Sequence, residues 1–115
     1  MTLTVLFGGV GYQPQDDALK KGTQIVIGTP GRILDHLRRG TLRLSGVHYL
    51  VLDEADQMLD KGFGPDVERI ISMTPASRQT ALFSATTPDW VRDVSKRYLL
   101  EPKSDSVTTE DEAPP

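Results

Sequence analysis

Short apolar segments alternate along this chain with segments that have the apolar spacing of helices, and this alternation constrains the fold most. Four apolar segments, each bounded by glycine or polar residues, cover residues 2–7, 24–27, 48–52 and 80–83. The helical faces between and after them carry Ile33, Leu34 and Leu37, then Val67, Ile70 and Ile71, then Val91, Val94 and Tyr98. The sequence therefore predicts an α/β fold with a mostly parallel sheet, flanking helices and right-handed crossovers.

Threonine, proline and glycine mark the expected helix boundaries, because threonine caps helices and proline fits their first turn. A short helix is predicted over residues 14–20, before Gly22, and further helices begin at Thr29-Pro30, at residues 63–65 and at Thr87-Pro88. The run over residues 48–52 is continuously apolar, which predicts a strand buried on both faces of the sheet.

Composition excludes several classes of site. The sequence contains no cysteine, so disulfides, cysteine zinc sites and thiol nucleophiles are excluded. Its two isolated histidines, His36 and His48, are predicted to be surface or boundary residues rather than metal ligands. No apolar run approaches the roughly 20 residues that span a bilayer, and the first residues lack the features of a signal peptide, so we expect a cytoplasmic protein.

Acidic residues are concentrated at one end of the 115-residue chain. The net charge is −3, but residues 104–115 contain four acidic residues and no basic ones, which leaves +1 for residues 1–103. We predict one folded domain over residues 1–103 and an acidic, disordered tail over residues 104–115. A near-neutral domain remains compatible with a surface that binds nucleic acid.

Polar residues follow three of the predicted strands, at Thr29, at Asp53-Glu54 and at Ser84-Ala85-Thr86. Ligands of open parallel sheets bind beyond the carboxyl ends of the strands, so we expect these residues to meet at one edge. An apolar strand that ends in two carboxylates is typical of the magnesium element of phosphate-loop ATPases: one carboxylate suffices to hold Mg²⁺, and its neighbour can orient or deprotonate water. The alternative is a plain helix start, where acidic residues are favoured.

The remaining motifs each have a structural alternative. Ser84 and Thr86 offer hydroxyls that can hydrogen-bond the carboxylates or only cap a turn. Thr29-Pro30-Gly31-Arg32 joins helix N-terminal N–H groups to a cation, which suits a nucleic-acid phosphate or simple capping. Gly8-Gly9 allows close approach of a ligand or forms a tight turn. A solvated face, rather than a basic patch, is predicted for Lys20, Lys21, His36, Arg38, Arg39 and Arg43.

In their order and spacing, these motifs resemble those of the DEAD-box RNA helicases, in the C-terminal portion of the first, RecA-like domain. The match covers residues 3 to about 102. It is carried by Gly8-Gly9, Thr29-Pro30-Gly31-Arg32, Val51-Leu52-Asp53-Glu54-Ala55-Asp56, Gly62-Phe63 and Ser84-Ala85-Thr86. The resemblance implies a partial RecA-like phosphate-loop NTPase fold and an enzyme that uses ATP and Mg²⁺ to unwind short RNA duplexes locally.

The resemblance also implies a role for each matching residue. Asp53 would coordinate the Mg²⁺ of bound ATP through water, and Glu54 would position or activate the attacking water. Asp56, Ser84 and Thr86 would link hydrolysis to strand separation. The sugar-phosphate backbone of RNA would be held without reading its sequence by Gly8, Gly9, Thr29, Pro30, Gly31 and Arg32.

Several parts of the family pattern are missing. The adenine-reading glutamine motif, the phosphate-binding loop and the Pro-Thr-Arg-Glu element are absent, and no glycine in the chain is followed by lysine. The second helicase domain is also absent; its arginine fingers typically contribute about 10³–10⁵ in rate. We therefore expect a truncated chain whose partners are RNA, the missing N-terminal half and the second domain. The phosphate-loop strand should lie beside residues 80–83, and the edge exposed without it invites self-association.

Three hypotheses remain open. The chain is a catalytic half-site of an ATP-dependent RNA helicase that is inactive alone, or a non-catalytic fragment that binds RNA in a salt-dependent way, or an inert truncation product with a poorly cooperative melt. An ATPase of another family with an Asp-Glu pair is disfavoured by the motifs over residues 29–32 and 84–86.

Overall fold

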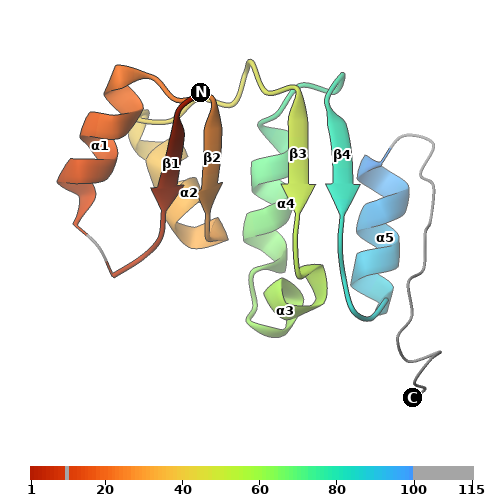
Figure 1. The fold of residues 1–115 in the computed structure, drawn as a ribbon. Coiled ribbons are helices and arrows are strands. Elements are labelled where there is room, and N and C mark those ends of the chain that lie inside the picture. The colour runs from red at the N-terminus through yellow and green to blue at the C-terminus, as the bar shows by residue number, and fades with distance from the viewer. Residues whose placement is uncertain (10, 100–115) are drawn as a thin grey trace.

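The computed structural model describes residues 1–9 and 11–99, so the predicted tail over residues 104–115 and the domain end at residue 103 lie outside the described residues. Within them, strands and helices alternate as the apolar pattern predicted (Figure 1). The elements are β1 (Leu3–Leu6), α1 (Tyr12–Lys21), β2 (Ile25–Gly28), α2 (Pro30–Arg39), β3 (Tyr49–Leu52), α3 (Ala55–Asp60), α4 (Gly64–Ser72), β4 (Gln79–Leu82) and α5 (Asp89–Tyr98). None of these helices is long and apolar enough to cross a membrane.

Helix boundaries follow the local signals with three differences. Helix α1 begins at Tyr12 rather than at Pro14, and the short helix α3 was not predicted from the apolar spacing. Helix α5 begins at Asp89, one residue later than expected, because Pro88 keeps an extended backbone with φ −63° and ψ 167°. Helix α2 begins at Pro30 as predicted, although the Thr29 side chain makes no capping hydrogen bond.

The strands pair in parallel, β1 with β2 and β3 with β4, which confirms the mostly parallel α/β fold. The described strands form two separate two-stranded sheets, because no hydrogen-bonded ladder joins β2 to β3. All four strands point the same way in Figure 1, and β2 and β3 are the facing edges of the two sheets. The sheet is therefore divided at its centre.

Helices α2 and α4 cover one face of the sheets and, together with α5, bury the predicted apolar stripes (Figure 1). One core cluster contains Leu6, Leu34, Leu37, Leu42 and Ile70, and the other contains Leu52, Val67, Ile71 and Val94. Ile70 of α4 belongs to the first cluster, so the packing of α2 against α4 joins the two halves of the molecule. Burial of each large apolar side chain contributes about 1.5–3 kcal/mol to this assembly.

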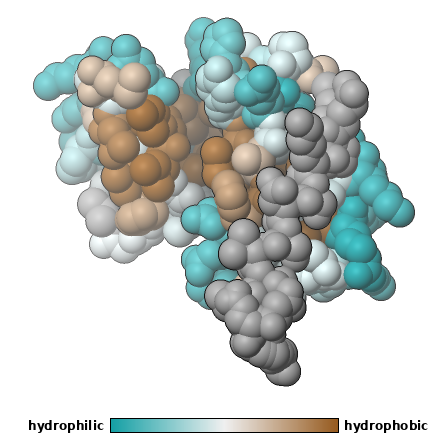
Figure 2. Space-filling model, turned by 45° about the vertical axis from the view of Figure 1, so that its right-hand side comes forward, coloured by the Kyte–Doolittle hydropathy of each residue, from teal (hydrophilic) through white to brown (hydrophobic). Residues whose placement is uncertain are grey.

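The opposite face of the sheets is open. Alternate side chains on β1, β2 and β3 remain exposed, namely Leu3, Val5, Ile25, Ile27, Tyr49 and Val51, and Figure 2 shows hydrophobic surface (brown) on this side. Tyr49 is 73% and Val51 is 59% exposed, so the prediction that residues 48–52 are buried on both faces is wrong here. The physical reason is that no described element packs over this side of β3.

Gly28 allows α2 to start directly behind β1. A Cβ atom at this position would lie 2.6 Å from the Leu6 carbonyl oxygen and 2.9 Å from Ile33 Cγ1. Because such contacts are too close for a side chain, only glycine fits between the end of β2 and the first turn of α2. The close contact fixes Thr29 and Pro30 at the carboxyl end of the first sheet.

Candidate functional site

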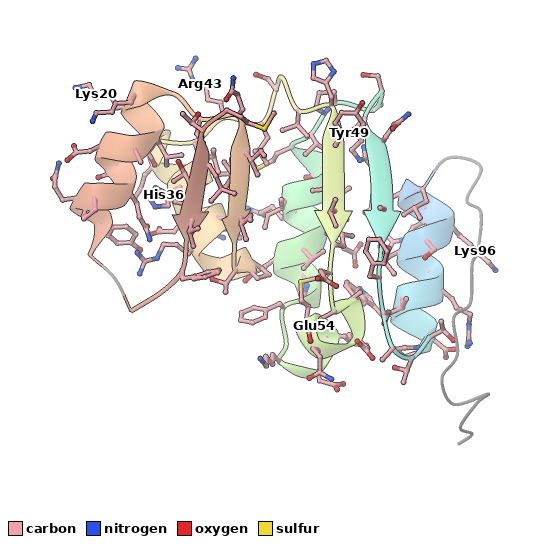
Figure 3. The ribbon with its side chains drawn as sticks, viewed as in Figure 1. Lys20, His36, Arg43, Tyr49, Glu54 and Lys96 are labelled. Atoms are coloured by element: carbon pink, nitrogen blue, oxygen red, sulfur yellow. The ribbon has the colours of Figure 1, made fainter. Side chains whose placement is uncertain are left out.

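The carboxyl end of β3 carries Asp53 and Glu54, whose side chains are exposed. Asp53 Oδ1 accepts a hydrogen bond of 2.9 Å from the Glu54 backbone N–H. Glu54 has φ 54° and ψ 49°, the left-handed conformation, and α3 begins immediately after it. A non-glycine residue in this conformation stores about 1–2 kcal/mol of strain, so the turn holds an acidic side chain at a backbone position that glycine would occupy more easily. Figure 3 shows Glu54 beyond the end of β3.

Asp56 is buried, at 6% exposed, and ties α3 to the segment after β4. Its Oδ2 accepts hydrogen bonds from the Thr86 backbone N–H at 3.0 Å and from Thr86 Oγ1 at 2.9 Å. Ser84 Oγ accepts from the Asp56 backbone N–H at 3.2 Å and donates to the Thr86 carbonyl oxygen at 2.6 Å. The Thr86 hydroxyl is the main reason that the pKa of Asp56 lies below its usual value, while burial opposes the shift. The hydroxyls of Ser84 and Thr86 were expected to bond the carboxylates after β3; of the two, the Thr86 hydroxyl bonds a carboxylate, and that carboxylate is Asp56. The Ser84 hydroxyl bonds backbone groups instead.

A hollow of about 200 Å³ lies between the end of β2 and the end of β3. Thr29 and Pro30 line one side, and Asp53 and Glu54 line the other, so two of the three predicted strand ends meet here. The remaining lining residues are Gly28, Gln57, Met58, Lys61 and Phe63. Sequence reasoning did not single out Gln57 or Lys61. Gln57 lies in α3 and Lys61 directly after it, so their closeness to Asp53-Glu54 in the sequence was the available signal. Ser84 and Thr86 do not line the hollow; they hydrogen-bond Asp56, the second residue of α3.

Gly31 and Arg32 lie in the first turn of α2, and Arg32 is directed toward α1 rather than into the hollow. Its Nη1 donates to Gln15 Oε1 at 3.1 Å, and its Cζ lies 4.0 Å from the centre of the Tyr12 ring. A Cβ atom added at Gly8 would lie 3.9 Å from Arg32 Nη2. The Gly8-Gly9 turn, with Gly9 at φ 82°, is therefore a direct neighbour of the arginine. Two segments predicted to contact RNA come together at this point.

His36 is completely buried, which contradicts its prediction as a surface or boundary residue. Its Nε2 lies 2.7 Å from Gln15 Oε1, and its Nδ1 lies 2.7 Å from Thr41 Oγ1. Burial lowers the pKa of His36, and the Asp16 carboxylate, 3.6 Å from Nδ1, opposes that shift. Figure 3 shows the ring beside α1, whereas Lys20 and Arg43 project outward. A signal existed, since His36 follows Ile33 by three positions and so lies close to the apolar face of α2.

Arg39 is exposed, as the predicted solvated face requires, and it also contacts α1. Its guanidinium forms an ion pair with Asp16 at 2.9 Å and lies 4.4 Å from the centre of the Tyr12 ring. The hydrogen bond to Asp16 raises the pKa of Arg39. Through these contacts Arg39, at the end of α2, holds α2 against α1, since both Asp16 and Tyr12 lie on α1.

Asp53 fits a magnesium ion in its donor chemistry, since it offers hard carboxylate oxygens at the edge of the hollow. Within residues 1–9 and 11–99, no group of three or more His, Cys, Asp or Glu side chains could hold a metal on its own. Mg²⁺ at Asp53 would therefore take most of its ligands from water and phosphate oxygens, which is the usual behaviour of this ion.

Comparison with known proteins decides the affiliation of the chain. The family model described as DEAD/DEAH box helicase matches residues 1–94. The chain belongs to this family. It is 59% identical over 98 residues to the ATP-dependent RNA helicase DeaD of Buchnera aphidicola subsp. Acyrthosiphon pisum, and 50% identical over 113 residues to DeaD of Haemophilus influenzae. These alignments cover 85% and 98% of this chain but only 16% and 18% of the two helicases.

A solved DEAD-box structure has the same fold. The crystal structure of a DEAD box protein from Methanococcus jannaschii matches with a TM-score of 0.84 at 46% identity, over 88% of this chain and 28% of that one. The resemblance to DEAD-box helicases and the α/β fold are thereby confirmed. The DEAD-box chain described here spans a small part of the length of its relatives.

Proposed function

We propose that this DEAD-box chain supplies the carboxylates and part of the RNA-contacting surface of an ATP-dependent RNA helicase, and that it hydrolyses ATP only together with the missing parts. The observation that carries the proposal is the hollow where Asp53 and Glu54 face Thr29 and Pro30. It combines carboxylates with a helix N-terminus, which suits a metal-bound polyphosphate on one side and a nucleic-acid backbone on the other.

Each residue has a defined task in this proposal. The Glu54 carboxylate orients the attacking water and accepts its proton, and the Asp53 carboxylate holds the ion that accompanies ATP. Bound Mg²⁺ would supply charge stabilisation at the phosphates. Asp56 transmits movement at the β3 turn to Ser84 and Thr86 through its hydrogen bonds. The chain contains no Gly-Lys pair, so the phosphate-binding loop must come from another segment.

RNA is held in the proposal by backbone N–H groups and one cation. The turn at Gly8-Gly9, the first turn of α2 from Thr29 through Pro30 and Gly31, and the guanidinium of Arg32 make up this surface. These groups recognise phosphate and sugar, and therefore bind without sequence preference. The cytoplasmic location expected from the sequence stays a prediction.

The open apolar face supports the proposed partner, which is the N-terminal half of a DEAD-box domain. Leu3, Val5, Ile27 and Val51 expose apolar surface on one side of parallel strands, and parallel sheets are normally covered on both faces. Strand edges also remain unpaired among the described strands, namely the outer edges of β1 and β4 and the facing edges of β2 and β3. A partner that adds a strand and helices buries both features, and without it we expect self-association through the same surface.

Hydrogen exchange tests the partner proposal. Adding a purified N-terminal DEAD-box segment is expected to slow amide exchange in β3 and β4. In sedimentation, the self-associated chain should be replaced by a one-to-one complex with that segment. Strong protection of residues 79–82 in the isolated monomer, equal to that in an intact domain, contradicts it.

RNA-stimulated ATP hydrolysis tests the proposed function. The chain alone is expected to show no turnover. Turnover is expected when the N-terminal segment and a second helicase domain are added, and it should disappear with Glu54→Gln. Turnover by the chain alone that vanishes in Glu54→Gln overturns the need for partners, and a folded ternary mixture without turnover overturns the catalytic half-site.

A non-catalytic RNA-binding fragment is the second candidate, favoured by the contact between Arg32 and the Gly8-Gly9 turn. It predicts RNA binding without nucleotide that weakens with salt. Binding that is lost in Arg32→Ala, in a chain that never supports ATP turnover, selects this candidate; no binding at low salt eliminates it.

A further inference from the structure

The side chain of Gln15, on α1, connects three segments that are distant in the sequence. It is 5% exposed. Its Nε2 donates to the Phe7 carbonyl oxygen at 3.1 Å, and its Oε1 accepts from Arg32 Nη1 at 3.1 Å and lies 2.7 Å from His36 Nε2. One amide therefore contacts the residue before the Gly8-Gly9 turn, the arginine of α2 and the buried histidine.

Hydrogen-bond chemistry fixes the orientation of this amide from both ends. The Phe7 carbonyl oxygen can only accept, so it faces the amide nitrogen of Gln15; the Arg32 guanidinium can only donate, so it faces the amide oxygen. His36 Nε2 must then donate to the same oxygen. At the other ring nitrogen, Thr41 Oγ1 lies 2.7 Å from Nδ1 and 3.1 Å from the His36 carbonyl oxygen, to which it donates its hydroxyl proton. Every polar atom of the Gln15 amide has a defined partner, so the side chain is held in one position.

Tyr12 holds the Arg32 guanidinium on a second side. The tyrosine ring stacks under Arg32 at 4.0 Å, meets His36 edge-on at 5.4 Å, and donates its hydroxyl to Asp35. Because the ring is fixed by these contacts, the guanidinium has little freedom to leave the Gly8-Gly9 turn.

We propose that Gln15 is a positioning residue for RNA binding: its buried amide holds Arg32 and the Gly8-Gly9 turn at a fixed separation, so that both grip the same stretch of RNA backbone. The inference rests on the proposed RNA-binding role of these two segments. Gln15 itself touches no RNA. Its contribution is to prepare the geometry before binding, which lowers the ordering cost of the complex.

A double-mutant cycle tests the proposal with the full 115-residue chain and a fluorescein-labelled ten-nucleotide polyuridine RNA at low salt. Arg32→Ala and Gln15→Met are each expected to weaken binding about tenfold, the scale of one hydrogen bond to a charged group. The double variant should bind no more weakly than Arg32→Ala, because the separation that Gln15 fixes between the turn and Arg32 has no effect on binding once the guanidinium is gone. The matched control is Gln13→Met, since Gln13 lies on the same helix, is exposed, and donates its side-chain amide to the exposed Asp17. This control should bind like the wild type.

Additive losses in the cycle, or wild-type binding by a folded Gln15→Met chain, overturn the proposal while leaving the proposed RNA surface intact. Wild-type binding by Arg32→Ala instead overturns the proposed surface and the inference with it. If Gln15→Met does not fold, Gln15→Glu serves as the second variant. Its carboxylate still accepts from Arg32 but repels the Phe7 carbonyl, so binding should weaken and its salt slope should fall by about one; an unchanged slope and affinity overturn the proposal.

Nitrogen NMR gives a readout that a general loss of stability does not move. In the wild type, His36 should be neutral with the proton on Nε2. That proton and the Arg32 side-chain N–H signals should be lost or shifted in Gln15→Met and retained in Gln13→Met. Unchanged signals in Gln15→Met show that the amide does not hold the arginine.

Discussion

The turn after β1 and the turn after β3 both contain a residue with positive φ, but the residue differs between them. Each leaves the carboxyl end of a parallel strand through a residue with positive φ, which is Gly9 in the first turn and Glu54 in the second. Glycine adopts that conformation freely, whereas glutamate is strained. We propose that the first turn serves close approach of its backbone to a ligand and that the second holds a carboxylate at that point.

The polar networks that support the two turns differ as well. Behind the first turn, Gln15 and His36 form a buried network centred on a neutral amide and a neutral ring. Beside the second, the charged carboxylate of Asp56 gathers donors from Thr86. Loss of a hydrogen-bond partner behind the first turn therefore leaves neutral polar groups unpaired. Loss of a donor beside the second turn leaves the charged Asp56 carboxylate with too few hydrogen bonds.

Removing the buried ring should have the largest effect. His36→Ala is expected to lower the free energy of unfolding by about 2–4 kcal/mol, because it leaves a cavity and removes two hydrogen bonds. Chemical denaturation measures the change. His48→Ala is the matched control, since His48 is exposed, and it should stay within about 0.5 kcal/mol of the wild type. Equal effects of the two variants contradict the buried network.

Removing one donor from Asp56 should have a smaller effect. Thr86→Val keeps the shape of the side chain and deletes the Oγ1 hydrogen bond, with an expected loss of roughly 1.5–2 kcal/mol, the low end for a bond to a charged group. Thr87→Val, at the exposed neighbouring position, should be near neutral. A loss of equal size in Thr87→Val shows that the segment responds to replacement of any threonine hydroxyl by a methyl group, rather than to the loss of the Asp56 hydrogen bond.

Acid should weaken the two networks in separate pH windows. The pKa of His36 lies below its ordinary value of 6.5, so its contribution is complete above pH 6.5 and is lost as pH falls from there through the folded pKa. The pKa of Asp56 lies below 3.8, so its contribution is complete above that value and is lost at lower pH. The measurement is the free energy of unfolding as a function of pH. The decrease that begins below pH 6.5 should be absent in His36→Gln, and part of the decrease below pH 3.8 should be absent in Asp56→Asn. Unchanged pH profiles contradict the shifts.

Relieving the strain at Glu54 should have the smallest effect, and of opposite sign. Asparagine tolerates the left-handed conformation better than glutamate, so Glu54→Asn is expected to raise the free energy of unfolding by a few tenths of a kcal/mol, up to about 1. Thermal denaturation measures it. Destabilisation by Glu54→Asn shows that the glutamate side chain makes a stabilising contact that outweighs its strain.

Much of this protein follows from the sequence by itself. The alternation of short apolar runs with helical stripes determined the strands, the helices and their parallel arrangement, because these depend on spacing and on local backbone preferences. The positions of Asp53 and Glu54 at a strand end, and of Thr29 and Pro30 at a helix start, follow from the same local rules. Their meeting at one hollow was predictable because parallel strands end at a common edge.

Only the tertiary structure decided the rest. The division into two sheets and the open face around Val51 depend on which elements are present to pack, and no local pattern reports that. The contact of Gln15 with His36 and Arg32 depends on the placement of α1 against α2, which is set by long-range packing. A glutamine and a histidine that look ordinary in the sequence acquire their roles because folding removes water from them and leaves each other as partners.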